Sequence, residues 1–181
     1  MKLVSHCDGN TPLYEAAYRG NIDHIELLLN HGADMNRDCH GWTPLMAAVY
    51  HRHVDVVEYL LQRGANVQYI NPEEGTTALY EAASIGYINI MQLLIDHGAQ
   101  VNTAFPPLNQ SPLYAAAKWG NLEAVRMLID LGADVHVMAT NGHTPLSIAR
   151  KYNRPVGGGN QMIGGYNQHI QVIELLELLQ S

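Results

Sequence analysis

The sequence predicts an all-α solenoid in which five similar units stack on one another. A short motif of Thr or Ser, then Pro or Ala, then Leu recurs at steps of 32 to 34 residues. In the first four copies, a Gly-Ala pair follows 21 residues after the Thr or Ser. A fixed period near 33 residues indicates a repeat array, in which each unit packs mainly on its neighbours. The motif begins at Thr11, Thr43, Thr77, Ser111 and Thr144.

Each motif predicts the start of a short helix. Thr and Ser are good N-caps, and Pro suits the first turn because the N–H that it lacks has no helical partner there. In the first unit, Leu13 and a pair of alanines follow, and Gly20 ends the helix. Gly86 and Gly120 hold the same place in units three and four, whereas unit two has Arg52 there.

A second helix follows in each unit, with apolar residues at i, i+3, i+6 and i+7. The glycine of the Gly-Ala pair supplies the left-handed position after this helix. We expect Leu60 and Leu94 to be buried between units. In the first four units, the apolar positions are Ile22, Ile25, Leu28 and Leu29; Val54, Val57, Leu60 and Leu61; Ile88, Met91, Leu94 and Ile95; and Leu122, Val125, Leu128 and Ile129.

These motifs, Thr-Pro-Leu-x-x-Ala-Ala, the glycine within the unit and Gly-Ala-Asp-x-Asn, resemble the ankyrin repeat. The resemblance implies helix-turn-helix units joined by β-hairpin-like linkers, with linker tips and first-helix ends on a concave face. It divides a single domain, residues 1–181, into units at about 5–37, 38–69, 70–102, 103–137 and 138–181.

The family's histidine at the fourth position of the motif is absent from this chain. Three of the five residues at that position are tyrosines, which we expect to pack between the first helices. The five residues are Tyr14, Met46, Tyr80, Tyr114 and Ser147.

Unit five departs most from the pattern. Its second helix aligns from His169 only if residues 154–168 are an insertion. Five glycines in this segment predict a flexible surface loop, mobile and removable without loss of the fold. The last helix is a predicted C-terminal cap, with an outer polar stripe of Gln171, Glu174 and Glu177.

The net charge of −7 is concentrated on the second helices, which contain nine acidic and two basic residues. The family fold would place these helices on the convex side, so we expect a solvated acidic face there. Nucleic acid is excluded as a partner class, because phosphate binding needs a basic face. No segment has the length and apolar character of a membrane span, and no signal peptide is visible. Two cysteines fit a reducing compartment.

Several patterns that could bear chemistry are incomplete. Cys7 and Cys39 occupy equivalent positions next to histidines, but a local Cys-x-x-Cys pair is missing, so we expect no metal. The glycine run at 157–159 has neither the preceding strand nor the Gly-Lys-Ser/Thr of a phosphate loop. His51 and His53 would point apart if their turn were helical. No nucleophile set recurs at a suitable spacing, so the sequence predicts no enzyme and no cofactor.

The residues that vary between units at the linker tips and first-helix ends form the predicted binding site. Trp and Tyr are enriched there, as they are in interface hot spots. We therefore predict a monomeric, non-catalytic module that binds another protein, in the cytoplasm or, for a secreted effector, in the host cytosol or nucleus. The predicted site residues are Tyr18, Arg19, His40, Trp42, Tyr50, His51, Glu73, Ile85, Gln110, Lys118, Trp119, His143 and Tyr152.

Two alternatives stay open at this level. The glycine-rich insertion could serve an enzyme site or a regulated module. The family resemblance also implies that Asn36 and Asn102 match the position modified by asparaginyl hydroxylases, which would make the chain a substrate.

Overall fold

The computed structural model describes residues 11–153 and 165–180, which form ten helices arranged as five pairs. Cys39 and Trp42 form the one isolated β-bridge of this described part. The helices are α1 (Pro12–Tyr18), α2 (Ile22–Asn30), α3 (Pro44–Tyr50), α4 (Val54–Gln62), α5 (Ala78–Ile85), α6 (Ile88–Asp96), α7 (Pro112–Trp119), α8 (Leu122–Asp130), α9 (Pro145–Tyr152) and α10 (Gly165–Leu178).

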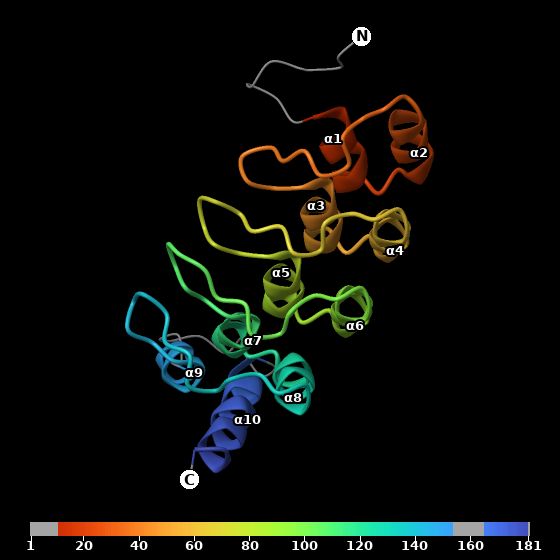
Figure 1. Ribbon diagram of the computed structural model, residues 1–181. Helices are drawn as coiled ribbons and strands as arrows, with labels where there is room; N and C mark the ends of the chain where they lie inside the picture. Colours follow the sequence, from red (N-terminus) through yellow and green to blue (C-terminus); the bar gives the residue numbers. More distant parts are fainter. Residues whose placement is uncertain (1–10, 154–164, 181) are drawn as a thin grey trace, which may run out of the picture.

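The pairs stack in chain order into a curved array (Figure 1). The first helix of each pair lies in a middle row, with the second helix on the outer side of the curve and the linker on the inner side. This arrangement confirms the predicted all-α repeat solenoid. The linker tips and the first helices therefore share the concave side of the molecule.

The predicted N-caps are confirmed at all five first helices. Each capping hydroxyl accepts a hydrogen bond from the backbone N–H three residues later, at 3.1–3.3 Å. In unit five the Ser147 hydroxyl returns the bond by accepting from the Thr144 N–H at 2.9 Å, which completes a capping box. The cap residues therefore fix where the first helix of every unit begins.

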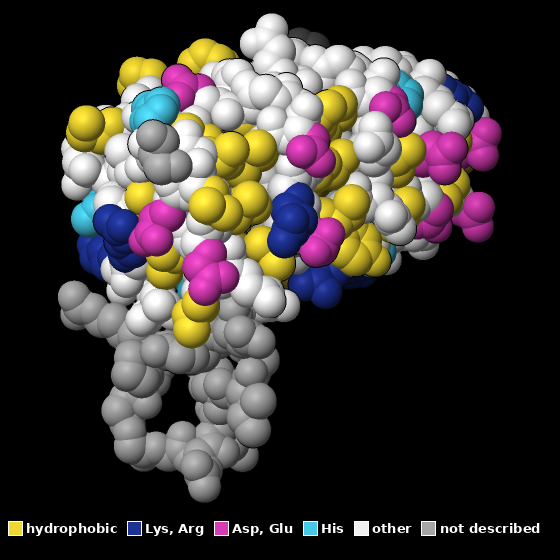
Figure 2. All heavy atoms as spheres, turned by 90° about the horizontal axis from the view of Figure 1, so that it is seen from below, with side chains coloured by type: hydrophobic (Ala, Val, Ile, Leu, Met, Phe, Trp, Pro, Cys, Tyr) yellow, Lys and Arg dark blue, Asp and Glu magenta, His cyan; other side chains and the backbone are white. Residues whose placement is uncertain are grey.

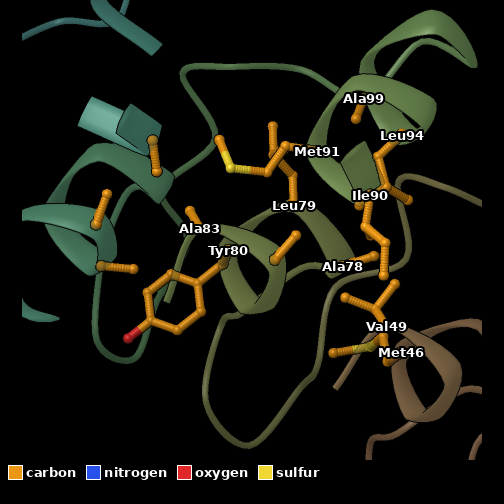
Figure 3. Close-up of a cluster of buried hydrophobic side chains, with 14 of the residues drawn as sticks. Met46, Val49, Ala78, Leu79, Tyr80, Ala83, Ile90, Met91, Leu94 and Ala99 are labelled. Atoms are coloured by element: carbon orange, nitrogen blue, oxygen red, sulfur yellow. The ribbon is translucent and has the colours of Figure 1, made fainter. Parts of the chain in front are cut away.

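The core lies between the two helix rows and continues from unit to unit. Leu60 and Leu94 have no exposed surface, as predicted. Figure 3 shows Met46 and Val49 of one unit beside Ile90 of the next. Neighbouring units therefore bury each other's apolar faces. Alanines in the first helices allow this close approach.

Two of the tyrosines at the fourth motif position, Tyr80 and Tyr114, are buried, as predicted, and they also bind the next linker. Tyr114 is 2% exposed, and its hydroxyl oxygen accepts a hydrogen bond from Asn141 Nδ2 at 2.8 Å. The Tyr80 hydroxyl donates to Gln110 Oε1 at 2.8 Å, and its ring points toward the next unit in Figure 3. These hydrogen bonds link consecutive units where the family's histidine is missing.

One local prediction was wrong. The second helix of unit five begins at Gly165, so residues 165–168 are the first turn of a longer helix rather than part of a loop. The rest of the proposed insertion, residues 154–164, lies outside the described residues. The turn that contains His51 and His53 is not helical, so the expectation that they point apart in a helix does not apply: His53 is the N-cap residue of α4, and the two rings stack with centroids 6.3 Å apart.

The acidic residues of the second helices are all exposed. Figure 2, which views the molecule from below, shows Asp and Glu side chains dispersed among hydrophobic ones. The polar stripe of Gln171, Glu174 and Glu177 is exposed on α10, as predicted for a capping helix. Within the described residues, no helix has the length and apolar character needed to cross a membrane.

Candidate functional site

The predicted site residues come mainly from three positions of the repeat, which together define the concave face. These positions are the residue just before the Thr or Ser cap and the seventh and eighth residues after it. In the described units they are Trp42, Thr76, Gln110 and His143; Tyr18, Tyr50, Ser84, Lys118 and Lys151; and Arg19, His51, Ile85, Trp119 and Tyr152.

Contacts within a unit join the linker tip to the end of the first helix. The rings of Trp42 and Tyr50 meet edge to face, with centroids 5.6 Å apart. In unit five, Lys151 Nζ lies 3.3 Å from His143 Nε2. Both contacts span the same two repeat positions, so the seventh residue after the cap faces the linker in these units.

Contacts between units join the seventh position of one unit to the eighth position of the next. The Tyr18 and His51 rings have centroids 3.9 Å apart. Lys118 Nζ lies 5.8 Å from the ring centroid of Tyr152 in the next unit. Within its own unit, it lies 5.3 Å from the ring centroid of Trp119. The structure therefore brings the predicted aromatic residues into two contiguous groups, one across units one and two and one across units four and five.

The rings on this face remain largely in contact with solvent. Trp119 is 55% exposed, Tyr50 51%, Tyr152 46% and Tyr18 42%. Burial and the neighbouring His53 lower the pKa of His51, which favours the uncharged form of its ring. The N-terminal group is built from aromatic rings, whereas the C-terminal group contains a cation beside two rings.

Other predicted residues are engaged elsewhere. Arg19 forms an ion pair with Glu15 at 2.7 Å, and Gln110 accepts the Tyr80 hydrogen bond. Glu73 is exposed at a linker tip, in a turn held by a hydrogen bond from its N–H to Asn71 Oδ1 at 2.8 Å. His40 is exposed at another tip, and Ile85 is half-buried on α5.

Sequence reasoning missed Glu81, a buried carboxyl in the middle of the array. It is 6% exposed, and burial raises its pKa to about 7, with Glu74 acting in the same direction and the Thr76 hydroxyl opposing it. Units two and four have Ala47 and Ala115 at the equivalent position, which is the signal that could have identified it.

A family profile described as ankyrin repeats in three copies matches residues 1–71 and 66–139. The chain belongs to the ankyrin repeat family. A search among curated proteins found no match. Ankyrin repeats generally mediate protein–protein interactions, and most of the concave face described here lies on the matched units.

The two asparagines that match the hydroxylase position in ankyrin repeats are exposed but hydrogen-bonded. Asn36 Oδ1 accepts from the Asn66 N–H at 2.8 Å. Asn102 Nδ2 donates to the Gly132 carbonyl at 3.0 Å, and its Oδ1 accepts from the Asp134 N–H at 2.8 Å. Both side chains thus join consecutive linkers in the folded array.

Proposed function

We propose that this ankyrin array is a non-catalytic adaptor, scaffold or inhibitor that binds another protein through its concave face. The observation that carries the proposal is the pair of contiguous aromatic groups whose four largest exposed rings are each 42–55% exposed. A ring that is half in solvent contributes only part of its burial energy to folding. When a partner covers such a ring, truncation to Ala commonly costs about 2–4 kcal/mol of binding.

The types of residue exposed on the two sides of the array also favour the concave face as the binding site. The second helices on the convex side carry the exposed acidic residues, which are typical of a solvated surface. The concave face instead combines Trp and Tyr, which are enriched in protein interfaces, with His and Lys side chains. We propose that the array acts as a monomer in the cytoplasm or, as a secreted effector, in the host cytosol or nucleus.

A matched pair of variants tests the proposal. Trp119→Ala removes a concave ring, whereas Leu27→Ala removes an equally exposed side chain, also 55%, from α2. Both variants are expected to keep the wild-type melting temperature within a few degrees, because neither side chain is in the core. Quantitative mass spectrometry of proteins captured from lysate should show specific partners lost with Trp119→Ala and kept with Leu27→Ala. Unchanged capture by Trp119→Ala together with a lower melting temperature would place the binding face elsewhere.

A further inference from the structure

The concave side of units four and five is cationic although the chain as a whole is acidic. The linkers and first helices of these units, residues 103–120 and 137–153, contain Lys118, Arg150 and Lys151 and no Asp or Glu. The corresponding segments of units two and three contain four acidic residues, Asp38, Glu73, Glu74 and Glu81, and two basic residues, Arg37 and Arg52, which both lie in unit two. The concave side therefore changes sign along the array, from an acidic unit three to basic units four and five.

Two of the three cations have no carboxylate partner. Arg150 Nη2 is 2.7 Å from Glu177 Oε1 of α10, so its charge is compensated. Lys118 lies over the rings of Trp119 and Tyr152, and Lys151 contacts the His143 imidazole. Within the described residues, neither lysine belongs to an ion pair.

The environment of these lysines is suited to a carboxylate from outside. Lys118 is half-buried and its ammonium lies beside two rings, so the side chain is held in place on this face, where a carboxylate would form a charge-assisted hydrogen bond. A cation–π contact uses the face of a ring and leaves ammonium N–H groups for other acceptors. Beside it, Trp119 offers an exposed apolar surface.

We propose that units four and five bind an acidic segment of the partner protein. Its carboxylates lie on Lys118 and Lys151, and an apolar side chain packs on Trp119. This inference rests on the proposed function and adds the chemistry of the partner. The carboxylates Glu73 and Glu74 on the neighbouring linker repel a further run of negative charge, so the acidic part is short. The same repulsion disfavours a continuous phosphate backbone along the array.

The test uses the whole chain, labelled with ¹⁵N, and a defined peptide. The probe is acetyl-Glu-Asp-Glu-Leu-Asp-Glu-amide, compared with its Gln/Asn analogue of the same length and with oligothymidylate. The acidic peptide is expected to shift the Trp119 indole N–H and the Lys118 and Tyr152 amide signals, with an affinity that falls as salt rises. The K118Q/K151Q variant should weaken this binding about tenfold or more, since each lysine makes a charge-assisted hydrogen bond.

The control variant R63Q/R126Q removes the same number of positive charges from the second helices and should bind the peptide as the wild type does. Four outcomes would overturn the inference: no binding, equal binding of the Gln/Asn analogue, no effect of K118Q/K151Q, or tighter binding of oligothymidylate. A result in which the neutral peptide shifts the same concave residues would reject the acidic segment and leave the proposed function intact. Failure of the proposed function is detected separately, by capture that is insensitive to Trp119→Ala.

Discussion

The guanidinium carbon of Arg52 lies 5.5 Å from the ring centroid of Tyr87 in the next unit. At three other junctions, a glycine stands in place of Arg52, and an Asn or His of the next unit stands in place of Tyr87. This Asn or His covers the glycine and hydrogen-bonds to backbone carbonyl oxygens of the preceding first helix. A Cβ atom on any of these glycines would come within 2.6–2.8 Å of the covering side chain. The three pairs are Gly20 with His53, Gly86 with Asn121, and Gly120 with His169.

The Arg52 junction differs from the other three because a residue other than glycine occupies the left-handed position. Arg52 has the left-handed backbone of those glycines, with φ 63°, but it carries a Cβ atom. An Asn or His at position 87 would collide with that atom. Tyr87 instead places its ring against the Arg52 side chain.

A double-mutant cycle tests this pairing. Arg52→Gly alone should change stability little, because relief of the left-handed strain offsets the loss of the cation–π contact, each about 1 kcal/mol. Tyr87→Asn alone should destabilise, whereas R52G/Y87N recreates the Gly–Asn contact and recovers most of the loss. Urea denaturation should give a coupling free energy of about 1 kcal/mol or more. Additive effects of the two changes would show that the residues are independent.

The other junctions make a second prediction, at Gly86. Gly86→Ala introduces a Cβ into the left-handed region and displaces Asn121, whose Nδ2 donates to the Ala83 and Ser84 carbonyls, both at 2.9 Å. The expected loss is about 2–3 kcal/mol, from backbone strain plus the lost hydrogen bonds. Gly132→Ala is the matched control, because its φ is 81° but nothing lies within 4 Å of the added atom. Equal losses in thermal or urea unfolding would mean that the Asn121 contact contributes nothing.

The sequence was sufficient for the repeat, because caps, apolar spacing and glycines recur and each copy supports the others. Arg52 was visible as a departure, but its partner Tyr87 was not, since the contact joins residues of different units. Glu81 was missed for a related reason: a carboxyl on a short helix looks exposed until the packing of adjacent linkers is known.

The next prediction compares two leucines of the second helices, one buried and one exposed. Leu60 is fully buried, whereas Leu27 is 55% exposed on the outer helix of unit one. Leu60→Ala should therefore cost about 2–5 kcal/mol, as at other well-packed sites, and Leu27→Ala about 0.5 kcal/mol or less. Denaturant midpoints at constant m-value give both numbers. A midpoint for Leu60→Ala that matches the wild type would contradict the helix register.

The buried Glu81 carboxyl makes stability depend on pH in an unusual direction. Its pKa is about 7 in the folded chain against an ordinary value of 4.5, so the folded state holds a proton that the unfolded state has released. The stabilisation is complete below about pH 4.5 and is lost as pH rises through about 7. At 1.36 kcal/mol per pKa unit, the total is about 3 kcal/mol.

Variants at this position should remove that dependence. The stability difference between wild type and Glu81→Gln, measured by urea unfolding, should move in favour of the variant as pH rises from about 4.5 to 7, because the histidines titrate equally in both proteins. Glu81→Ala should be more stable than wild type above neutral pH, since Ala47 and Ala115 already fit this position with almost no exposure. Glu73→Gln is the control, because Glu73 is exposed on the same linker tip and is not among the groups that shift the pKa of Glu81. A difference between wild type and Glu81→Gln that stays constant with pH would mean that the Glu81 carboxyl reaches solvent in the folded protein.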